Sequence, residues 1–218
     1  MNGMTPFYRN CIAVVSRIFR VLFRYRVVTH GSVPVGGAVC CANHTSWIDP
    51  LFVAFSQRRQ VHFMGKVELF RHKLLGKLIR KLGAFPVTRG TGGAEALAHA
   101  ETLLRDGRLV GLFPEGTRSK TGVLLPGKTG AVRLAHDCGV PIIPMAIVCG
   151  GAPRVRLFRR TYVVVGEPIP PEALGIETGS GLEIRNATRM LMSRIAALQQ
   201  EGRTLCAQPH KKESKTAI

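Results

Sequence analysis

The sequence predicts an α/β fold in which a mainly parallel central sheet is flanked by helices, preceded by an amphipathic N-terminal helical segment. Short apolar runs alternate with stretches of helical periodicity, as is typical of domains built on parallel strands. Glycine closes several helical stretches, which is typical of helix ends. A chain of 218 residues has room for one such domain and an appendage. We therefore divide it into an amphipathic segment (1–27), an α/β domain (28–207) and a disordered basic tail (208–218).

Residues 7–29 combine apolar and basic side chains at helical spacing. The apolar run is too short, and too soon interrupted by arginine, for a signal peptide or a spanning helix. A basic amphipathic helix of this kind lies in the membrane interface, and the alternative is a surface helix packed on the domain. At about 100° per residue, the basic side holds Arg9, Ser16, Arg17, Arg20 and Arg24, and the apolar side Phe7, Cys11, Val14, Val15, Ile18, Val21 and Leu22.

The apolar run Ala38–Ala42 predicts a buried strand, and the residues after it contain His44 and Asp49. Two helical residues five positions apart do not share a face, so we predict a strand that ends in a turn. Asp49 then takes the N-cap position of a helix, with Pro50 at the first helical position. Such a turn folds the carboxylate back toward the imidazole and gives a general base. The alternative is a buried histidine beside an aspartate that only caps the helix.

The rest of the chain continues the alternation of strands and helices. A short strand leads into a helix from about Glu68 to Leu82, closed by Gly83, with leucines on one face. Its basic residues form either a solvated face or a second membrane-facing one. Further helices are predicted at 94–106, 130–138 and 182–200, and further strands at 108–113, 140–148 and 161–165.

The loop from Leu112 to Ser119 follows a predicted buried strand, so it opens at the carboxyl edge of the sheet, where ligands bind in open α/β folds. Gly116 allows the backbone to approach a ligand closely. Arg118 offers a bidentate fork for a phosphate. Taken by itself, the same pattern also fits a plain turn.

Residues Gly122 to Thr129 match the phosphate-loop pattern GxxxxGKT. A working phosphate loop follows directly from a strand and opens a helix. A helix follows here, but residues 118–121 are polar and make a poor strand. We therefore predict that Lys128 binds no nucleotide.

The charge of the chain predicts a polyanionic partner. Lys and Arg number 31 against 13 Asp and Glu, which gives a formal charge of +18, and both nucleic acid and an anionic membrane surface attract such a protein. Aromatic residues are only 6% and the basic residues are scattered, so we expect no nucleic-acid partner. The six cysteines lack metal-ligand spacing, which favours core residues in a reducing compartment and no metal site.

Four ordered sequence blocks give the chain a specific resemblance. Over about residues 28–170 it resembles the glycerolipid acyltransferase family, which includes 1-acyl-sn-glycerol-3-phosphate (lysophosphatidic acid) acyltransferases. In that family a Phe-Lys-x-Gly loop typically follows the third block, whereas Gly127 stands in the Phe position here. The blocks are His44-x4-Asp49 (the HX4D motif), Gly65-Lys66-x-Glu68-Leu69 with Gly83-Ala84-Phe85-x3-Arg89, Phe113–Ser119, and Val140–Pro144.

The resemblance implies an acyl transfer without an acyl-enzyme. His44, oriented by Asp49, would deprotonate the free sn-2 hydroxyl of lysophosphatidic acid, whose oxygen attacks the thioester of acyl-CoA or acyl carrier protein to give phosphatidic acid. It also implies that Lys66, Arg89 and Arg118 hold the acceptor phosphate and that Glu115, Gly116 and Thr117 shape its pocket. The thioester is a co-substrate, and no cofactor is expected.

The acceptor and the location follow from the same resemblance. The same chemistry on another lysolipid, such as a lyso-ornithine lipid, is the alternative. An acceptor without phosphate would leave Arg89 and Arg118 without their anion, which favours a lysophospholipid. We expect a peripheral or monotopic protein of phospholipid biosynthesis at the cytoplasmic face of the inner (plasma) membrane, bound to the anionic lipid surface.

Overall fold

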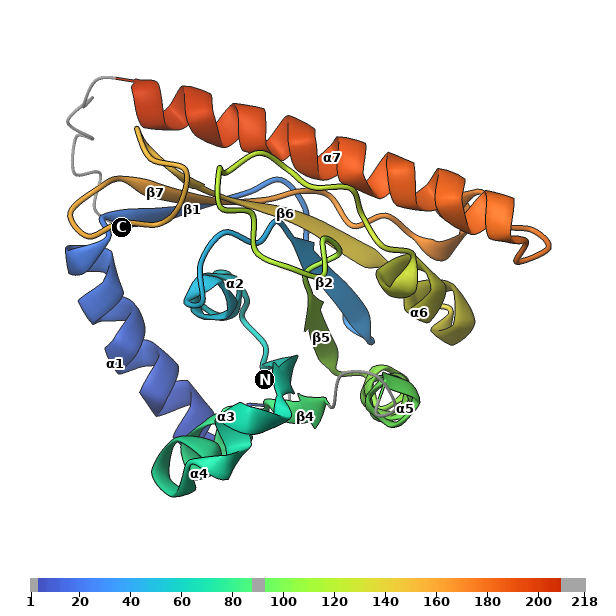
Figure 1. Ribbon diagram of the computed structural model, residues 1–218, viewed down its shortest axis with the longest axis horizontal. Coiled ribbons are helices and arrows are strands. Elements are labelled where there is room, and N and C mark those ends of the chain that lie inside the picture. The colour runs from blue at the N-terminus through green and yellow to red at the C-terminus, as the bar shows by residue number, and fades with distance from the viewer. Residues whose placement is uncertain (1–3, 88–92, 209–218) are drawn as a thin grey trace.

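The computed structural model describes residues 4–87 and 93–208 and contains a seven-stranded sheet between two layers of helices (Figure 1). Its strands are β1 (Tyr25–Thr29), β2 (Ala38–Ala42), β3 (Val61–Lys66), β4 (Phe85–Val87), β5 (Leu109–Leu112), β6 (Ile142–Cys149) and β7 (Thr161–Val165). Their order is β1-β7-β6-β2-β5-β3-β4. Every neighbouring pair is parallel except β6 and β7. The predicted α/β fold with a mainly parallel sheet is confirmed.

Helices cover both faces of the sheet. They are α1 (Pro6–Leu22), α2 (Asp49–Ser56), α3 (Val67–Arg71), α4 (Lys73–Lys81), α5 (Gly93–Arg105), α6 (Gly130–Cys138) and α7 (Gly181–Ala207), with a short 3₁₀ helix at Pro171–Leu174. In Figure 1, α7 runs along one face, and α1 and α2 lie on the other. Side chains from α5, α6 and α7 form one core, and those from α1 and α2 form the second.

Strand β2 lies in the middle of the sheet and is buried along its whole length. Val39 and Cys41 point into the core with α7, while Ala38, Cys40 and Ala42 point into the core with α2. A strand buried on both faces needs apolar residues at every position, not at alternate ones. The uninterrupted apolar run of this segment follows from that double burial.

The predicted helix over residues 7–29 is wrong at its end. Helix α1 ends at Leu22, and Tyr25–Thr29 forms β1 beside β7, so residue 27 lies inside the sheet. Tyr25 is buried and its ring packs against Phe52 of α2, with centroids 5.6 Å apart. This aromatic contact holds the segment in the sheet. The domain therefore begins before residue 28.

Helix α1 packs one side on the domain and exposes another apolar stripe. Tyr8 is buried, and the ring of Phe19 meets Phe52 with centroids 5.7 Å apart. The outward side leaves large apolar side chains in contact with solvent, up to 72% exposed at Val21. The exposed stripe consists of Phe7, Val14, Ile18 and Val21. The predicted apolar side is thus divided between the core and the surface.

The single helix predicted from Glu68 to Leu82 is also wrong, because the chain breaks at His72 into α3 and α4. His72 adopts an extended conformation. Gly76 lies against the backbone of Phe70, where a Cβ atom would come within 2.5 Å of the Phe70 carbonyl oxygen. The glycine thus allows α4 to fold back over α3. Gly83, with φ +89°, follows the end of α4 as predicted.

Apart from the end of α7, the other predicted elements agree with the structure to within a few residues. Helix α7 extends past the predicted end at residue 200, because Gly202 lies against Val148 of β6 and keeps the helix on the sheet. Residues 209–218, which carry most of the predicted disordered tail, lie outside the described residues. Among the described residues, no helix is both long and apolar enough to cross a membrane.

Candidate active site

His44 and Asp49 form a hydrogen-bonded pair at the carboxyl edge of the sheet. Asp49 Oδ2 accepts a hydrogen bond from His44 Nδ1 at 2.9 Å and two more from the backbone N–H groups of Thr45 (2.6 Å) and Ser46 (2.7 Å). The Asp49 side chain is fully buried, whereas that of His44 is 18% exposed. Among the described residues, none is hydrogen-bonded to His44 Nε2. The prediction that the turn folds the carboxylate back to the imidazole is confirmed.

The helix after this turn begins one residue earlier than predicted. Asp49 is the first residue of α2, Ile48 is its N-cap, and no side chain caps the helix. The Asp49 carboxylate points backward instead, to N–H groups that precede the helix. The aspartate therefore organises the turn that carries His44, and the predicted N-cap position of Asp49 is wrong.

A stack of aromatic rings supports the imidazole of His44. The rings of His44 and Phe113 are stacked with centroids 4.0 Å apart and 15° between their planes, and Phe63 lies behind Phe113 at 6.2 Å. Gly111 of β5 pairs with Phe63 of β3, and a Cβ atom at position 111 would lie 2.1 Å from the Phe63 ring. Gly111 therefore leaves the space in which this stack forms. Sequence analysis missed this support, since it depends on strand register.

Glu115 joins the turn of His44 to the loop after β5. It is 3% exposed, and its two carboxylate oxygens accept hydrogen bonds from the backbone N–H groups of His44 (2.6 Å) and Leu125 (2.9 Å). Ser119 N–H also donates to the His44 carbonyl oxygen at 2.7 Å. Burial raises the pKa of the Glu115 carboxyl, against the lowering effect of these N–H donors. With both oxygens occupied by backbone, Glu115 shapes the site by fixing its loops.

The predicted phosphate-binding residues lie on one side of His44. Lys66 is the last residue of β3, and Thr117 and Arg118 are exposed on the loop after β5, the strand between β3 and β2. Neither Lys66 nor Arg118 forms an ion pair or side-chain hydrogen bond within the described part of the chain. Arg89 lies outside the described residues. The two described cations are therefore available to a ligand at this edge.

Lys128 lies across the glycine of the same loop. A Cβ atom at Gly116, which has φ +67°, would lie 2.8 Å from Lys128 Cε. The described residues between β5 and α6 contain no strand, so the phosphate-loop pattern lacks the strand it requires. Gly127 packs under α7, where a Cβ atom would lie 2.6 Å from Met192. Lys128 is thus a further cation near the predicted phosphate site, although it was not among the residues predicted to hold the phosphate.

Comparisons with known proteins agree with this geometry. The family model described as Acyltransferase matches residues 24–148. The 1-acyl-sn-glycerol-3-phosphate acyltransferase of Bacillus subtilis is 31% identical over 166 residues, which cover 74% of this chain and 82% of the relative. That of Streptococcus pneumoniae is 35% identical over 109 residues, 49% of this chain and 40% of the relative.

A solved structure has the same fold. The crystal structure of the 1-acyl-sn-glycerophosphate (LPA) acyltransferase PlsC from Thermotoga maritima aligns with a TM-score of 0.68 at 25% identity, over 94% of this chain and 81% of that chain. Fold and site together define an α/β enzyme with a histidine–aspartate pair at the carboxyl edge of its sheet. The chain belongs to the acyltransferase family. The catalytic and binding roles of individual residues remain predictions.

Proposed function

We propose that the protein transfers a fatty acyl group from an acyl thioester to the free sn-2 hydroxyl of lysophosphatidic acid, giving phosphatidic acid. The His44–Asp49 pair is the observation on which the reaction depends, because it supplies a base with one free ring nitrogen. The two bacterial relatives support this acceptor, since both are 1-acyl-sn-glycerol-3-phosphate acyltransferases. The donor is acyl-CoA or an acylated carrier protein.

The proposed chemistry needs one proton shuttle. Asp49 accepts the Nδ1 proton of His44, which leaves Nε2 to take the proton of the acceptor hydroxyl. The hydroxyl oxygen bonds to the thioester carbonyl carbon, and the tetrahedral intermediate collapses by breaking the carbon–sulfur bond. The imidazolium then returns the proton to the departing sulfur. Asp49 stabilises the imidazolium between these two steps, so no covalent acyl-enzyme is required.

In this proposal the acceptor phosphate binds on the side of His44 where β5 and β3 lie. Lys66, Arg118 and Lys128 are exposed cations there, and the first two have no partner among the described residues. Arginine and lysine bind phosphate oxygens through charge-assisted hydrogen bonds. A phosphate at this position would hold the sn-2 hydroxyl near His44. Arg89 is expected to join them.

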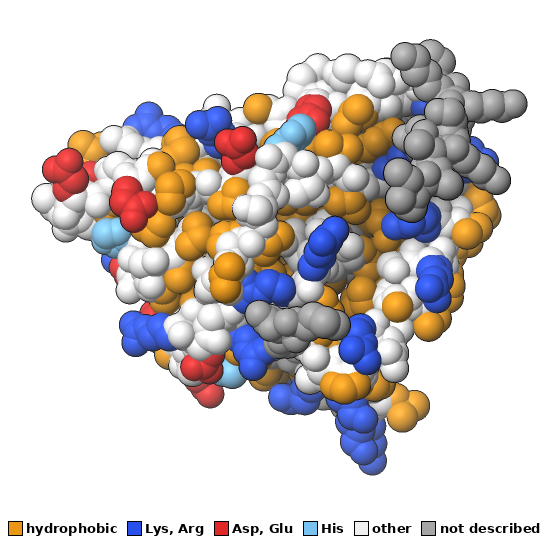
Figure 2. Space-filling model, turned by 180° about the vertical axis from the view of Figure 1, so that it is seen from behind, with side chains coloured by type: hydrophobic (Ala, Val, Ile, Leu, Met, Phe, Trp, Pro, Cys, Tyr) orange, Lys and Arg blue, Asp and Glu red, His pale blue; other side chains and the backbone are white. Residues whose placement is uncertain are grey.

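Attachment to an anionic lipid surface is part of the proposal. The exposed stripe of α1 continues toward α4, since Lys81 Nζ lies 5.2 Å from the centroid of the Phe7 ring. Leu74 of α4 is 87% exposed, and Trp47 beside the His44 turn is 77% exposed. Figure 2 shows Lys and Arg side chains interspersed with hydrophobic ones over the lower part of one face, where few side chains are acidic. Such a mixture suits a lipid interface, on the cytoplasmic side where thioester donors are made.

An acyl-transfer assay tests this function. Purified full-length protein is given lysophosphatidic acid, another lysophospholipid and lyso-ornithine lipid, each with acyl-CoA and with an acylated carrier protein, and product is measured by mass. We expect the highest kcat/KM with lysophosphatidic acid and a loss of about 10²- to 10⁴-fold in His44→Ala. Equal use of the phosphate-free acceptor would refute the proposed acceptor. Near-normal turnover by His44→Ala would refute the proposed base.

A further inference from the structure

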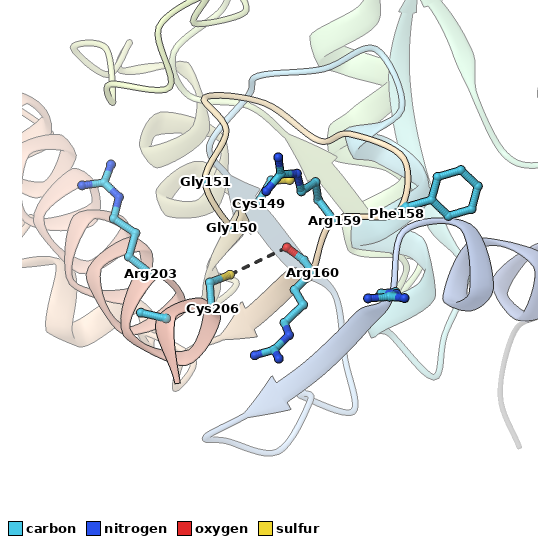
Figure 3. Close-up of a pocket in the computed structure, with 10 residues that line it drawn as sticks. Cys149, Gly150, Gly151, Phe158, Arg159, Arg160, Arg203 and Cys206 are labelled. Atoms are coloured by element: carbon cyan, nitrogen blue, oxygen red, sulfur yellow. Dashed lines mark hydrogen bonds between the residues drawn. The ribbon is translucent and has the colours of Figure 1, made fainter. Parts of the chain in front are cut away.

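A cavity of about 440 Å³ lies at the carboxyl edge of the sheet (Figure 3). In the strand order it falls on the opposite side of β2, the strand that leads to His44, from Lys66 and Arg118. Its walls come from the end of β6, the loop before β7, the residue before β1 and the last turns of α7. Strands β1 and β7 run against the other strands, so their first residues meet the end of β6 at this edge. The cavity is therefore built from segments far apart in the sequence.

Arginine dominates the walls of this cavity. Its four arginines are Arg24, Arg159, Arg160 and Arg203, and none of the described residues that line it is acidic. Arg160 donates to the Gln208 carbonyl oxygen at 2.6 Å. The other three have no side-chain hydrogen bond or ion pair within the described residues. In Figure 3, Arg159 comes from the loop before β7 and Arg203 from α7. Unpaired guanidinium groups around a concave site favour a phosphorylated ligand.

The backbone around the cavity is strained and held by tertiary contacts. Among the described residues, Arg24 (φ 44°) and Phe158 (φ 60°) are the two non-glycine residues with positive φ, and both line this cavity. Bulky residues rarely adopt that conformation. The Phe158 N–H donates to the Leu22 carbonyl oxygen at 2.6 Å, which ties the loop to the end of α1. Backbone strain that surrounding structure maintains is typical of functional sites.

A second cavity lies beside the first and borders the turn of His44. It has a volume of about 550 Å³ and shares Cys149, Gly151 and Arg203 with the first. Its lining also includes Asn43 and Thr45, the two neighbours of His44. Arg159 stands at the junction, because its Nη1 would lie 3.5 Å from a Cβ atom at Gly151. The two cavities therefore share part of their walls, and the second borders the turn that carries the proposed base.

We propose that the arginine-lined cavity binds the phosphorylated nucleotide end of a coenzyme A thioester, and that the second cavity takes its pantetheine arm. This inference rests on the proposed acyl transfer and assigns its donor. Coenzyme A carries a diphosphate and a 3′-phosphate on one adenosine, which match Arg24, Arg159 and Arg203. The thioester then reaches His44 from the side opposite the acceptor phosphate, so that the like charges of the two substrates stay apart.

The shape of the site distinguishes this donor from an acylated carrier protein. Concave pockets of several hundred Å³ are typical of small-molecule sites. A carrier protein would instead need an open basic surface of about 800 Å² per partner. The arginine-lined cavity includes no residue of the phosphate-loop pattern, of which Gly122 and Val123 line the second cavity. The cavity therefore favours coenzyme A.

Calorimetry with coenzyme A itself tests the site on the full chain in detergent. The variant combines Arg159→Gln with Arg203→Gln, and the matched control combines Arg156→Gln with Arg194→Gln. The control removes one exposed arginine from each of the same two segments, neither of which lines either cavity. An exposed arginine–phosphate contact contributes about a three- to tenfold factor in affinity. We expect the dissociation constant to rise about 10- to 100-fold in the variant and less than about threefold in the control.

Kinetics with two donors complete the test. We expect the variant to raise KM for acyl-CoA by a similar factor, with kcat nearly unchanged, and to leave transfer from the phosphate-free acyl-N-acetylcysteamine thioester unaffected. Equal effects of variant and control, or equal slowing with both donors, would overturn the proposal. So would transfer from an acylated carrier protein by a protein that does not bind coenzyme A. If no donor supported transfer but coenzyme A binding still depended on the two arginines, the proposed function would fail while the site stood.

Discussion

Replacing Asp49 with asparagine removes the negative charge beside His44 but is expected to keep the geometry of the turn. Asp49 Oδ2 accepts three hydrogen bonds, from His44 Nδ1 and from the N–H groups of Thr45 and Ser46. An amide oxygen can accept the same three. The amide nitrogen would replace Oδ1, which is buried and has no hydrogen-bond partner among the described residues. We therefore expect the turn to form in Asp49→Asn while the charge is lost.

The size of the effect follows from simple electrostatics. An imidazolium and a carboxylate whose charges lie about 4 Å apart attract by about 4 kcal/mol at an effective dielectric constant of about 20. This attraction exists only after His44 has taken the proton, so its loss falls on the transition state and not on substrate binding. A change of about 4 kcal/mol lowers kcat about 10³-fold. The unpaired buried amide also costs about 1–3 kcal/mol of stability.

The assay compares kcat in detergent micelles with the midpoint of thermal unfolding. Val53→Ala is the control, because Val53 is buried in the same helix and the substitution leaves the charge at Asp49 in place. We expect the control to lower Tm with little change in kcat, and Asp49→Asn to lower kcat about 10³-fold with KM nearly unchanged. If Asp49→Asn kept more than about a tenth of the normal rate, the reasoning about the charge would be wrong.

Three further variants test the support of the site and the attachment of the protein. Gly111→Ala places a Cβ atom 2.1 Å from the ring of Phe63 on β3. We therefore expect a lower kcat and a loss of about 1–3 kcal/mol in the free energy of unfolding. Unchanged thermal unfolding would contradict the register of β3 and β5. Burial raises the pKa of the Glu115 carboxyl, so the stability due to this group falls as pH rises from its unfolded toward its folded pKa. Replacing Glu115 with glutamine removes this dependence of stability on pH. It also leaves one side-chain oxygen to accept hydrogen bonds from the N–H groups of His44 and Leu125. We therefore expect the Tm deficit of Glu115→Gln to be largest near about pH 4 and to narrow toward neutral pH; a deficit that widens would refute this assignment. The double variant Val14→Asp with Ile18→Asp is expected to abolish co-sedimentation with anionic vesicles while leaving turnover in micelles intact. The control is Leu182→Asp, which changes an exposed leucine on α7 and should still sediment with the vesicles. Equal sedimentation of the double variant and the control would exclude α1 as the segment that attaches the protein to the membrane.

Local patterns in the sequence predict most of the fold. Helix α6 and strand β7 have the predicted bounds, because apolar periodicity and a following glycine are properties of neighbouring residues. Strand β1 was missed because Tyr25–Thr29 continues the basic and apolar pattern of α1, and only its pairing with β7 makes it a strand. The break at His72 was missed because it depends on the contact between Gly76 and Phe70.

The candidate site also has parts that local sequence patterns predict and parts that they do not. The His44–Asp49 pair could be predicted because its members are five residues apart and one turn joins them. The stack behind His44 could not, since Phe63 and Phe113 meet only through the register of β3 and β5. The arginine-lined cavity draws on residues from 24 to 207, so no local pattern indicates it. Predictions from sequence succeed where the interacting groups are close along the chain.

The topology of the sheet gives a reason for the position of the site that does not depend on family resemblance. The chain leaves β2 through α2, which packs in one core, and leaves the neighbouring strand β5 toward α6, which packs in the other. Beyond these two loops the chain therefore departs to opposite faces of the sheet, at the carboxyl ends of β2 and β5, which is the position where ligands bind in open α/β sheets. His44 follows the first strand and Phe113 the second. The same divergence leaves one side of His44 to Lys66 and Arg118 and the other to the arginine-lined cavity, so two anionic substrates can approach one base without sharing a binding surface.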